Sequence, residues 1–95
     1  MKKRVVLLGK GDLAIRIAQW FKSSIRYDLI EVVPDLPEPE WSGSFMGWSM
    51  VNDINVVRSG DYRDASSNID LCMSVFYGKI LKKDFIESCG NVINL

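Results

Sequence analysis

The sequence predicts an α/β protein with an open parallel-sheet, Rossmann-like three-layer fold, truncated after the fifth strand. Short β-branched runs alternate with segments whose apolar residues repeat at helical spacing. The runs are apolar throughout rather than alternating, which is typical of parallel strands buried on both faces. With 95 residues, of which 47% are hydrophobic, the chain forms a single domain over residues 1–95.

The first half of the chain predicts two strands around one helix. Lys3–Leu8 is expected to be the first strand, and Tyr27–Val33 the second. Between them, the apolar residues of Leu13–Phe21 share one helical face, and Asp12 is placed as the N-cap or as a first-turn acid. This β-α-β unit puts a glycine-containing turn at the carboxyl end of the first strand.

The middle of the chain predicts shorter elements. Apolar spacing indicates a second helix that begins at Ser42 or Ser44 and ends at Asn52. Asn55–Arg58 is expected to be a short third strand, followed over Ser59–Asn68 by a polar loop or a weak helical turn. The three tryptophans are interpreted as core or half-core residues, at Trp20, Trp41 and Trp48.

The last third predicts a second β-α-β unit. Ile69–Tyr77 is expected to be a central fourth strand and Ile80–Ser88 a third helix, with Gly90 as its C′ residue. Asn91–Leu95 starts a fifth strand. The expected strand order is third, second, first, fourth, fifth.

Composition excludes several classes of function. Twelve Lys and Arg balance twelve Asp and Glu, so no nucleic-acid partner is expected, and the apolar runs are too short for a membrane span. The chain has no histidine, which removes His-based acid–base chemistry and His-ligated metal sites. Cys72 and Cys89 are interpreted as free thiols in a cytoplasmic protein, and Cys72 as a packing residue rather than a nucleophile.

The first turn fits a dinucleotide-binding pattern. Gly9, Lys10 and Gly11 begin a G-x-G-x-x-A run between a strand and a helix, where free N–H groups favour a phosphate. Glu31 lies twenty residues after Gly11, where such folds place an acid that binds the ribose. Asp12 would repel a pyrophosphate, so the pattern supports a small dinucleotide-binding module only as an alternative.

A second pattern lies in the last third of the chain. Tyr77-Gly78-Lys79-Ile80-Leu81, followed by Val92-Ile93-Asn94-Leu95, resembles in order and spacing the formyltransferase family that uses 10-formyltetrahydrofolate. That family includes methionyl-tRNA, glycinamide ribonucleotide and sugar N-formyltransferases. The resemblance implies that the chain is the N-terminal part of a formyltransferase catalytic domain.

The resemblance also implies roles for individual residues. Asn94 aligns with the catalytic asparagine, whose amide would hydrogen-bond the formyl oxygen. Gly9, Lys10 and Gly11 occupy the place of a loop that binds the acceptor substrate, a small-molecule amine for which we favour an amino sugar. The pocket for the pterin of the folate would be lined by Phe76, Tyr77, Gly78, Ile80 and Leu81.

The family's catalytic histidine and aspartate have no counterpart in this chain. We therefore expect the chain to be inactive alone, with weak or absent folate affinity, and to form a homodimer through its fifth strand as an exposed edge. A non-catalytic interaction fragment remains a third hypothesis.

Overall fold

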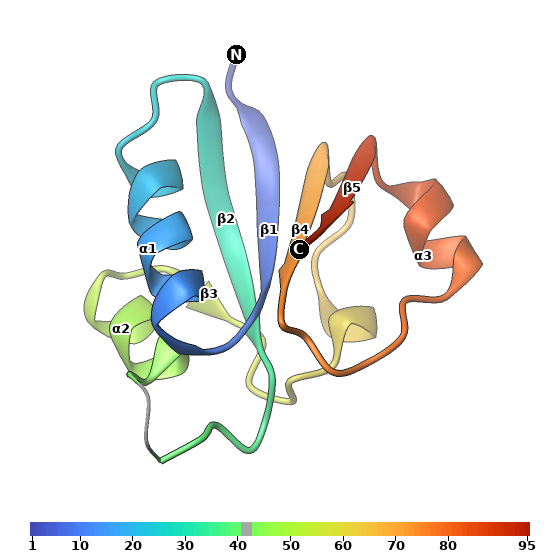
Figure 1. Cartoon of the computed structure of the whole chain (residues 1–95). Helices are drawn as coiled ribbons and strands as arrows, with labels where there is room; N and C mark the ends of the chain where they lie inside the picture. Colours follow the sequence, from blue (N-terminus) through green and yellow to red (C-terminus); the bar gives the residue numbers. More distant parts are fainter. Residues whose placement is uncertain (41–42) are drawn as a thin grey trace.

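The computed structural model describes residues 1–40 and 43–95, which form a five-stranded, all-parallel sheet with helices on both faces (Figure 1). This confirms the predicted fold class. The elements in chain order are β1 (Lys3–Gly9), α1 (Gly11–Lys22), β2 (Tyr27–Pro34), α2 (Phe45–Val51), β3 (Asn55–Val56), the 3₁₀ turn η1 (Tyr62–Asp64), β4 (Leu71–Val75), α3 (Lys83–Ser88) and β5 (Asn91–Asn94).

The strand order is β3-β2-β1-β4-β5, as predicted. β1 lies at the centre, where Val5, Val6, Leu7 and Leu8 are fully buried. Two parallel neighbouring strands must be joined by a segment that crosses over one face of the sheet. Here α1 and α2 cover one face, and η1 and α3 lie on the other (Figure 1). The order reverses between β1 and β4, so these two strands and their neighbours frame the edge where ligands bind in such sheets.

Each face of the sheet has its own core. On the side of α1 and α2, Leu7 and Val32 pack with Phe21 and Phe45. On the other side the buried cluster consists of Val6, Leu8, Val33, Val57, Tyr62, Ile69, Cys72 and Cys89. The two layers explain why the strand sequences are apolar at consecutive positions.

The first helix begins two residues before its apolar pattern, at Gly11, and Asp12 lies in its first turn as expected. Its apolar face is only partly covered. Ala14, Ala18 and Phe21 are buried, whereas Leu13 is 43% exposed and Trp20 is 60% exposed. The prediction that Trp20 belongs to the core or half-core is therefore wrong, because its ring lies on the outer flank of the helix, edge-on to Phe21.

The second helix begins after Ser44, whose hydroxyl accepts a hydrogen bond from the N–H of Gly47 and so acts as the N-cap. Trp48 packs on the core as expected. Trp41 and the alternative start at Ser42 lie outside the described residues. The third strand is shorter than predicted and ends at Val56, because Gly60 donates to the carbonyl of Val57 and turns the chain into η1.

The last third differs from the prediction in three places. β4 is shorter than the predicted Ile69–Tyr77: it begins at Leu71, and it ends at Val75 because Phe76 has a positive φ of 57°. The third helix begins at Lys83 rather than Ile80, so Ile80 and Leu81 lie in the turn before it. Gly90 does not have the left-handed conformation of a C′ glycine. Instead, a Cβ at Gly90 would lie 2.6 Å from the carbonyl oxygen of Asp70, so the close approach to β4 requires glycine.

No helix in the described part of the chain is both long and apolar enough to cross a membrane.

Candidate functional site

The carboxyl ends of the strands meet at one edge of the sheet because all five strands are parallel. β1 ends at Gly9, β4 at Val75 and β5 at Asn94. The sharp turn at Phe76 sends the chain across this edge before α3 begins. The segment 76–82 therefore lies beside the ends of β4 and β5.

A cavity of about 380 Å³ lies between this segment, β4, β5 and α3. Its volume is within the range of roughly 300–1,000 Å³ that small-molecule pockets occupy. The cavity is lined by Ser74, Tyr77, Gly78, Lys79, Ile80, Leu81, Ile86, Val92 and Asn94.

The cavity brings together five of the residues that the sequence pattern singled out. Four of them lie in the turn after β4, namely Tyr77, Gly78, Ile80 and Leu81, and the fifth, Asn94, belongs to β5. Phe76 does not line the cavity and is 58% exposed, because its positive φ turns the residue away from the strand. Lys79, within the predicted turn, lines the cavity as well, and so do Ser74, Ile86 and Val92, which were not predicted.

Two tyrosines hold the turn in place. The hydroxyl of Tyr77 accepts a hydrogen bond from the backbone N–H of Tyr62 at 3.0 Å and donates to the carbonyl of Gly60 at 2.7 Å. The hydroxyl of Tyr62 in turn accepts from the N–H of Lys82 at 2.9 Å. Burial raises the pKa of Tyr77 to about 12, so its hydroxyl stays protonated and keeps donating at neutral pH. Tyr77 thus lines the cavity with its ring while its hydroxyl anchors the turn.

Tyr62 was not recognised as a functional residue in the sequence, where it falls in a polar segment. It is only 3% exposed, and its ring lies edge-on to Phe85 of α3 with the ring centroids 4.8 Å apart. Asp61 caps η1 by accepting from the N–H of Arg63, whose guanidinium lowers the pKa of Asp61 to about 2. These contacts form a clamp, made of Tyr62 and Tyr77, that fixes both ends of the turn.

Two uncharged polar side chains of the cavity have no hydrogen-bond partner among the described residues. Neither the hydroxyl of Ser74 nor the side-chain amide of Asn94 makes a hydrogen bond to another described residue, and the two residues pair directly across β4 and β5. Asn94 is exposed, whereas Ser74 is 4% exposed. A buried hydroxyl without a partner costs about 1–3 kcal/mol, which makes Ser74 unusual in this fold.

The glycine loop lies on the same edge, next to β4. A Cβ at Gly9 would lie 2.2 Å from the carbonyl oxygen of Val75, so Gly9 is required by the contact between β1 and β4. Gly11, with φ 79°, begins α1. The amine of Lys10 is held 3.0 Å from a carboxylate oxygen of Asp35.

Two carboxylates therefore flank the glycine loop. One is Asp35, and the other is Asp12, which accepts a hydrogen bond from the N–H of Gly43 at 3.1 Å. Their negative charge opposes the attraction of a helix N-terminus for a phosphate. The arrangement suits an uncharged or cationic group better than a pyrophosphate.

Glu31 does not lie at the edge. It is three residues before the end of β2 at Pro34, and its carboxylate accepts hydrogen bonds from the N–H and the hydroxyl of Ser66. The side chain is thus committed to fixing the loop before β4. This placement gives no support to a ribose-binding role.

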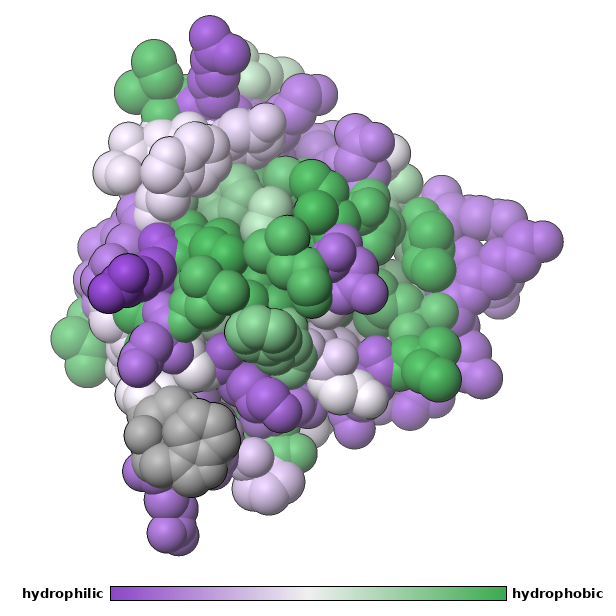
Figure 2. Space-filling view, in the orientation of Figure 1, coloured by the Kyte–Doolittle hydropathy of each residue, from purple (hydrophilic) through white to green (hydrophobic). Residues whose placement is uncertain are grey.

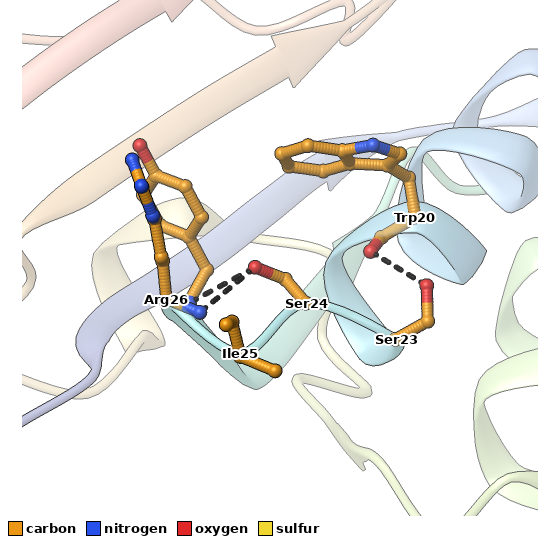
Figure 3. Close-up of a pocket in the computed structure, with 6 residues that line it drawn as sticks. Trp20, Ser23, Ser24, Ile25 and Arg26 are labelled. Atoms are coloured by element: carbon orange, nitrogen blue, oxygen red, sulfur yellow. Dashed lines mark hydrogen bonds between the residues drawn. The ribbon is translucent and has the colours of Figure 1, made fainter.

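A larger hollow of about 520 Å³ lies at the opposite, amino edge of the sheet, between α1 and β2 (Figure 3). Its serines are used by the turn itself, as Figure 3 shows: the hydroxyl of Ser23 donates to the carbonyl of Trp20, and that of Ser24 accepts from the N–H groups of Arg26 and Tyr27. The hollow is therefore a feature of the α1–β2 connection, in which the two serine hydroxyls already bond to the backbone.

Both cysteines are buried and unpaired. Burial raises the pKa of Cys72 to about 12 and raises that of Cys89 as well. A thiol that remains protonated at neutral pH is a poor nucleophile, which agrees with a packing role for Cys72. Within residues 1–40 and 43–95, no three Cys, Asp or Glu side chains gather as metal ligands would.

The chain matches no family model, and no curated protein matches it. Among solved structures it is similar to an N-formyltransferase from Helicobacter canadensis, determined in complex with folinic acid and dTDP-3-aminofucose. The TM-score is 0.67 at 21% sequence identity, and the match covers 96% of this chain and 33% of that chain. The chain therefore has the fold of one third of that enzyme's length.

Proposed function

We propose that this chain is the N-terminal, folate-binding part of a formyltransferase catalytic domain. The observation that carries the proposal is the cavity at the ends of β4 and β5. It combines the Tyr77–Leu81 turn with Asn94, the two segments whose sequences resemble the family. The fold supports the proposal, because it is similar to that of an N-formyltransferase solved with folinic acid.

The cavity suits the flat ring of a folate. Ile80, Leu81 and Val92 supply apolar walls, while backbone groups of the turn and the free side chains of Ser74 and Asn94 supply hydrogen bonds. The formyl donor would be 10-formyltetrahydrofolate. The clamp of Tyr62 and Tyr77 holds the turn before any ligand binds, which lowers the entropy lost on binding.

Asn94 has the chemistry needed to stabilise a developing oxyanion. Its amide N–H is a hydrogen-bond donor, and Asn94 lines the cavity without an internal partner among the described residues. When an acceptor amine attacks a formyl carbon, negative charge builds on the formyl oxygen, and a donor held nearby stabilises that charge. The proton lost by the amine needs a base, which the family supplies through a histidine and an aspartate.

This chain contains no histidine, so the 95 residues lack the imidazole that the mechanism requires. We therefore propose that the chain does not catalyse formyl transfer alone.

The acceptor would be a small-molecule amine, and we favour an amino sugar carried on a nucleotide, as in the complex of the Helicobacter canadensis enzyme. The loop that would contact this acceptor follows β1, the strand next to β4, and consists of Gly9, Lys10 and Gly11. We also propose a cytoplasmic location, which accords with the two unpaired thiols.

The proposed ligand predicts a specific footprint in an NMR titration. Adding folinic acid to the ¹⁵N-labelled chain should shift the amide signals of Ser74, Gly78–Leu81 and Asn94, because these groups line the cavity. Of the weak or absent affinity that the sequence predicts, the cavity favours weak binding: the dissociation constant should be weaker than micromolar but measurable at millimolar ligand, since the chain provides only part of a pocket. NADH should leave the same signals unchanged.

Two outcomes would contradict the proposal. Folinic acid at millimolar concentration could leave the cavity signals unmoved. Alternatively, NADH could shift the signals of Gly9–Ala14 and lose that effect in Gly11→Val, which would favour the dinucleotide-binding module instead. A chain that binds neither ligand would favour a non-catalytic interaction fragment.

We also propose that the chain self-associates as a two-fold dimer through β5 and the adjoining α3. In the part of the chain that the structure describes, β5 pairs with β4 alone, so its outer edge presents unpaired N–H and C=O groups. Ile93 and Leu95 are 42% and 57% exposed. Figure 2 shows hydrophobic surface gathered at the centre of the face that Figure 1 draws between α1 and β5.

A charge on this edge should weaken the dimer. Ile93→Lys is expected to raise the dimer dissociation constant at least tenfold, because a lysine would have to be desolvated at the interface. Analytical ultracentrifugation measures the constant. Ile25→Lys is the matched control, since Ile25 is 86% exposed in the α1–β2 connection at the amino edge of the sheet. A wild-type chain that sediments as a folded monomer at high concentration would contradict the proposal.

A further inference from the structure

Among residues 1–40 and 43–95, two serines are fully or almost fully buried, and only one of them has a hydrogen-bond partner there. Ser49 is 0% exposed, and its hydroxyl donates to the carbonyl of Phe45 at 2.8 Å. Ser74 is 4% exposed, and its hydroxyl makes no hydrogen bond to any residue that the structure describes. Buried polar groups in folded proteins are nearly always paired, so a free one requires an explanation.

The position of Ser74 supplies that explanation. Ser74 lies near the end of β4 and lines the cavity together with the turn that follows the strand. Its backbone is already used, because the carbonyl of Ser74 accepts from the N–H of Leu95. The hydroxyl is thus the buried one of the two uncharged polar groups that line the cavity without a partner among the described residues, and Ser74 pairs with Asn94 across β4 and β5.

We propose that the Ser74 hydroxyl is a specificity-determining group that hydrogen-bonds the polar edge of the bound folate ring. The proposal rests on the function proposed above and adds a residue to it. A hydroxyl both donates and accepts, so it can pair with either kind of group on a pteridine. A ligand with a donor or acceptor at this position forms a hydrogen bond with the Ser74 hydroxyl that the free protein lacks. A flat apolar ligand would leave the hydroxyl without a hydrogen bond and would therefore bind more weakly.

The proposal predicts opposite effects of one substitution on stability and on binding. Ser74→Ala removes a buried hydroxyl that has no partner, so the free protein should become more resistant to urea. The same change removes the bond to the ligand, so the affinity for folinic acid should fall roughly tenfold. A residue that only packs would not separate the two effects in this way.

The experiment compares three proteins: wild type, Ser74→Ala and Ser49→Ala. Urea unfolding gives the midpoint of each free protein, and the NMR titration with folinic acid gives each dissociation constant. Ser49→Ala is the matched control, because Ser49 is equally buried but packs in α2 on the other face of the sheet. Its affinity for folinic acid should stay within about twofold of the wild type, since it touches no ligand.

Each outcome decides the matter. A raised unfolding midpoint with a tenfold loss of affinity in Ser74→Ala supports the role of the hydroxyl. Equal affinity of wild type and Ser74→Ala overturns it while leaving the proposed function intact. A lowered midpoint in Ser74→Ala also overturns it, because the hydroxyl would then have a partner in the free protein. No binding by the wild type itself overturns the proposed function and the role of Ser74 together.

Discussion

Replacing Gly9 by alanine is expected to lower the free energy of unfolding more than most single substitutions in this protein would. The added Cβ would lie 2.2 Å from the carbonyl oxygen of Val75, which is a backbone atom of the interior strand β4 and cannot move aside cheaply. The φ of Gly9, 153°, is one that residues with side chains rarely adopt. We expect a loss of about 3–5 kcal/mol, against the roughly 5–15 kcal/mol that a domain of this size possesses.

Urea unfolding followed by circular dichroism measures this loss. Gly47→Ala is the matched control, because Gly47 lies within α2, where an added Cβ meets only the side chain of Ser44 at 3.1 Å and 3.4 Å. Alanine at that helical position should change the free energy of unfolding by less than about 1 kcal/mol. A Gly9→Ala protein as stable as the wild type would show that β1 and β4 do not approach as closely as described.

Removing the side chain of Tyr62 should have a similarly large effect. Tyr62 is 3% exposed, its hydroxyl accepts from the N–H of Lys82, and its ring packs on Phe85. Tyr62→Ala should destabilise the protein by about 3–5 kcal/mol, because it leaves a cavity and an unpaired N–H. The turn that lines the ligand cavity would lose its anchor at the same time.

Two further variants separate the contributions to this effect. Tyr62→Phe keeps the ring and removes only the hydroxyl, so it should cost about 1 kcal/mol and speed hydrogen exchange at the amide of Lys82. Trp20→Ala removes a larger aromatic side chain that is 60% exposed and should cost less than about 1 kcal/mol. The clamp would be refuted if Tyr62→Ala were no more destabilising than Trp20→Ala.

Much of the fold follows from local pattern. The order of strands and helices, and the parallel sheet that they form, depend on hydrophobic periodicity, which is a property of consecutive residues. The pairing of the Tyr77–Leu81 turn with Asn94 could be predicted because both segments resemble one family. The structure places them in one cavity.

The sequence predictions are wrong where one residue pattern is compatible with two different local structures. Ile80 and Leu81 fit the apolar face of a helix, yet they belong to a turn whose apolar side chains face a cavity. Gly90 sits where helices often end in a left-handed glycine, but here the nearby carbonyl of Asp70 requires it. Trp20 is apolar at a helical core position and still lies on the surface, because no helix or strand of the described residues covers that flank of α1.

Other features leave no trace in the sequence. Tyr62 and Tyr77 are fifteen residues apart, and only the folded chain shows that each holds the other's segment. Ser74 is one residue in an apolar strand, and its missing partner becomes visible only when the surroundings of its hydroxyl are known. Burial and hydrogen-bond satisfaction are tertiary properties, so sequence periodicity cannot reveal them.

The central claim is that the cavity between the Tyr77–Leu81 turn and Asn94 holds a folate. Isotope-filtered nuclear Overhauser measurements on the ¹³C-labelled chain with unlabelled folinic acid test it most directly. The account predicts cross-peaks from the ligand's ring protons to the methyl groups of Ile80, Leu81 and Val92, which line the cavity. Cross-peaks to Leu13 and Ala14 beside the glycine loop, with none to those three residues, would contradict it.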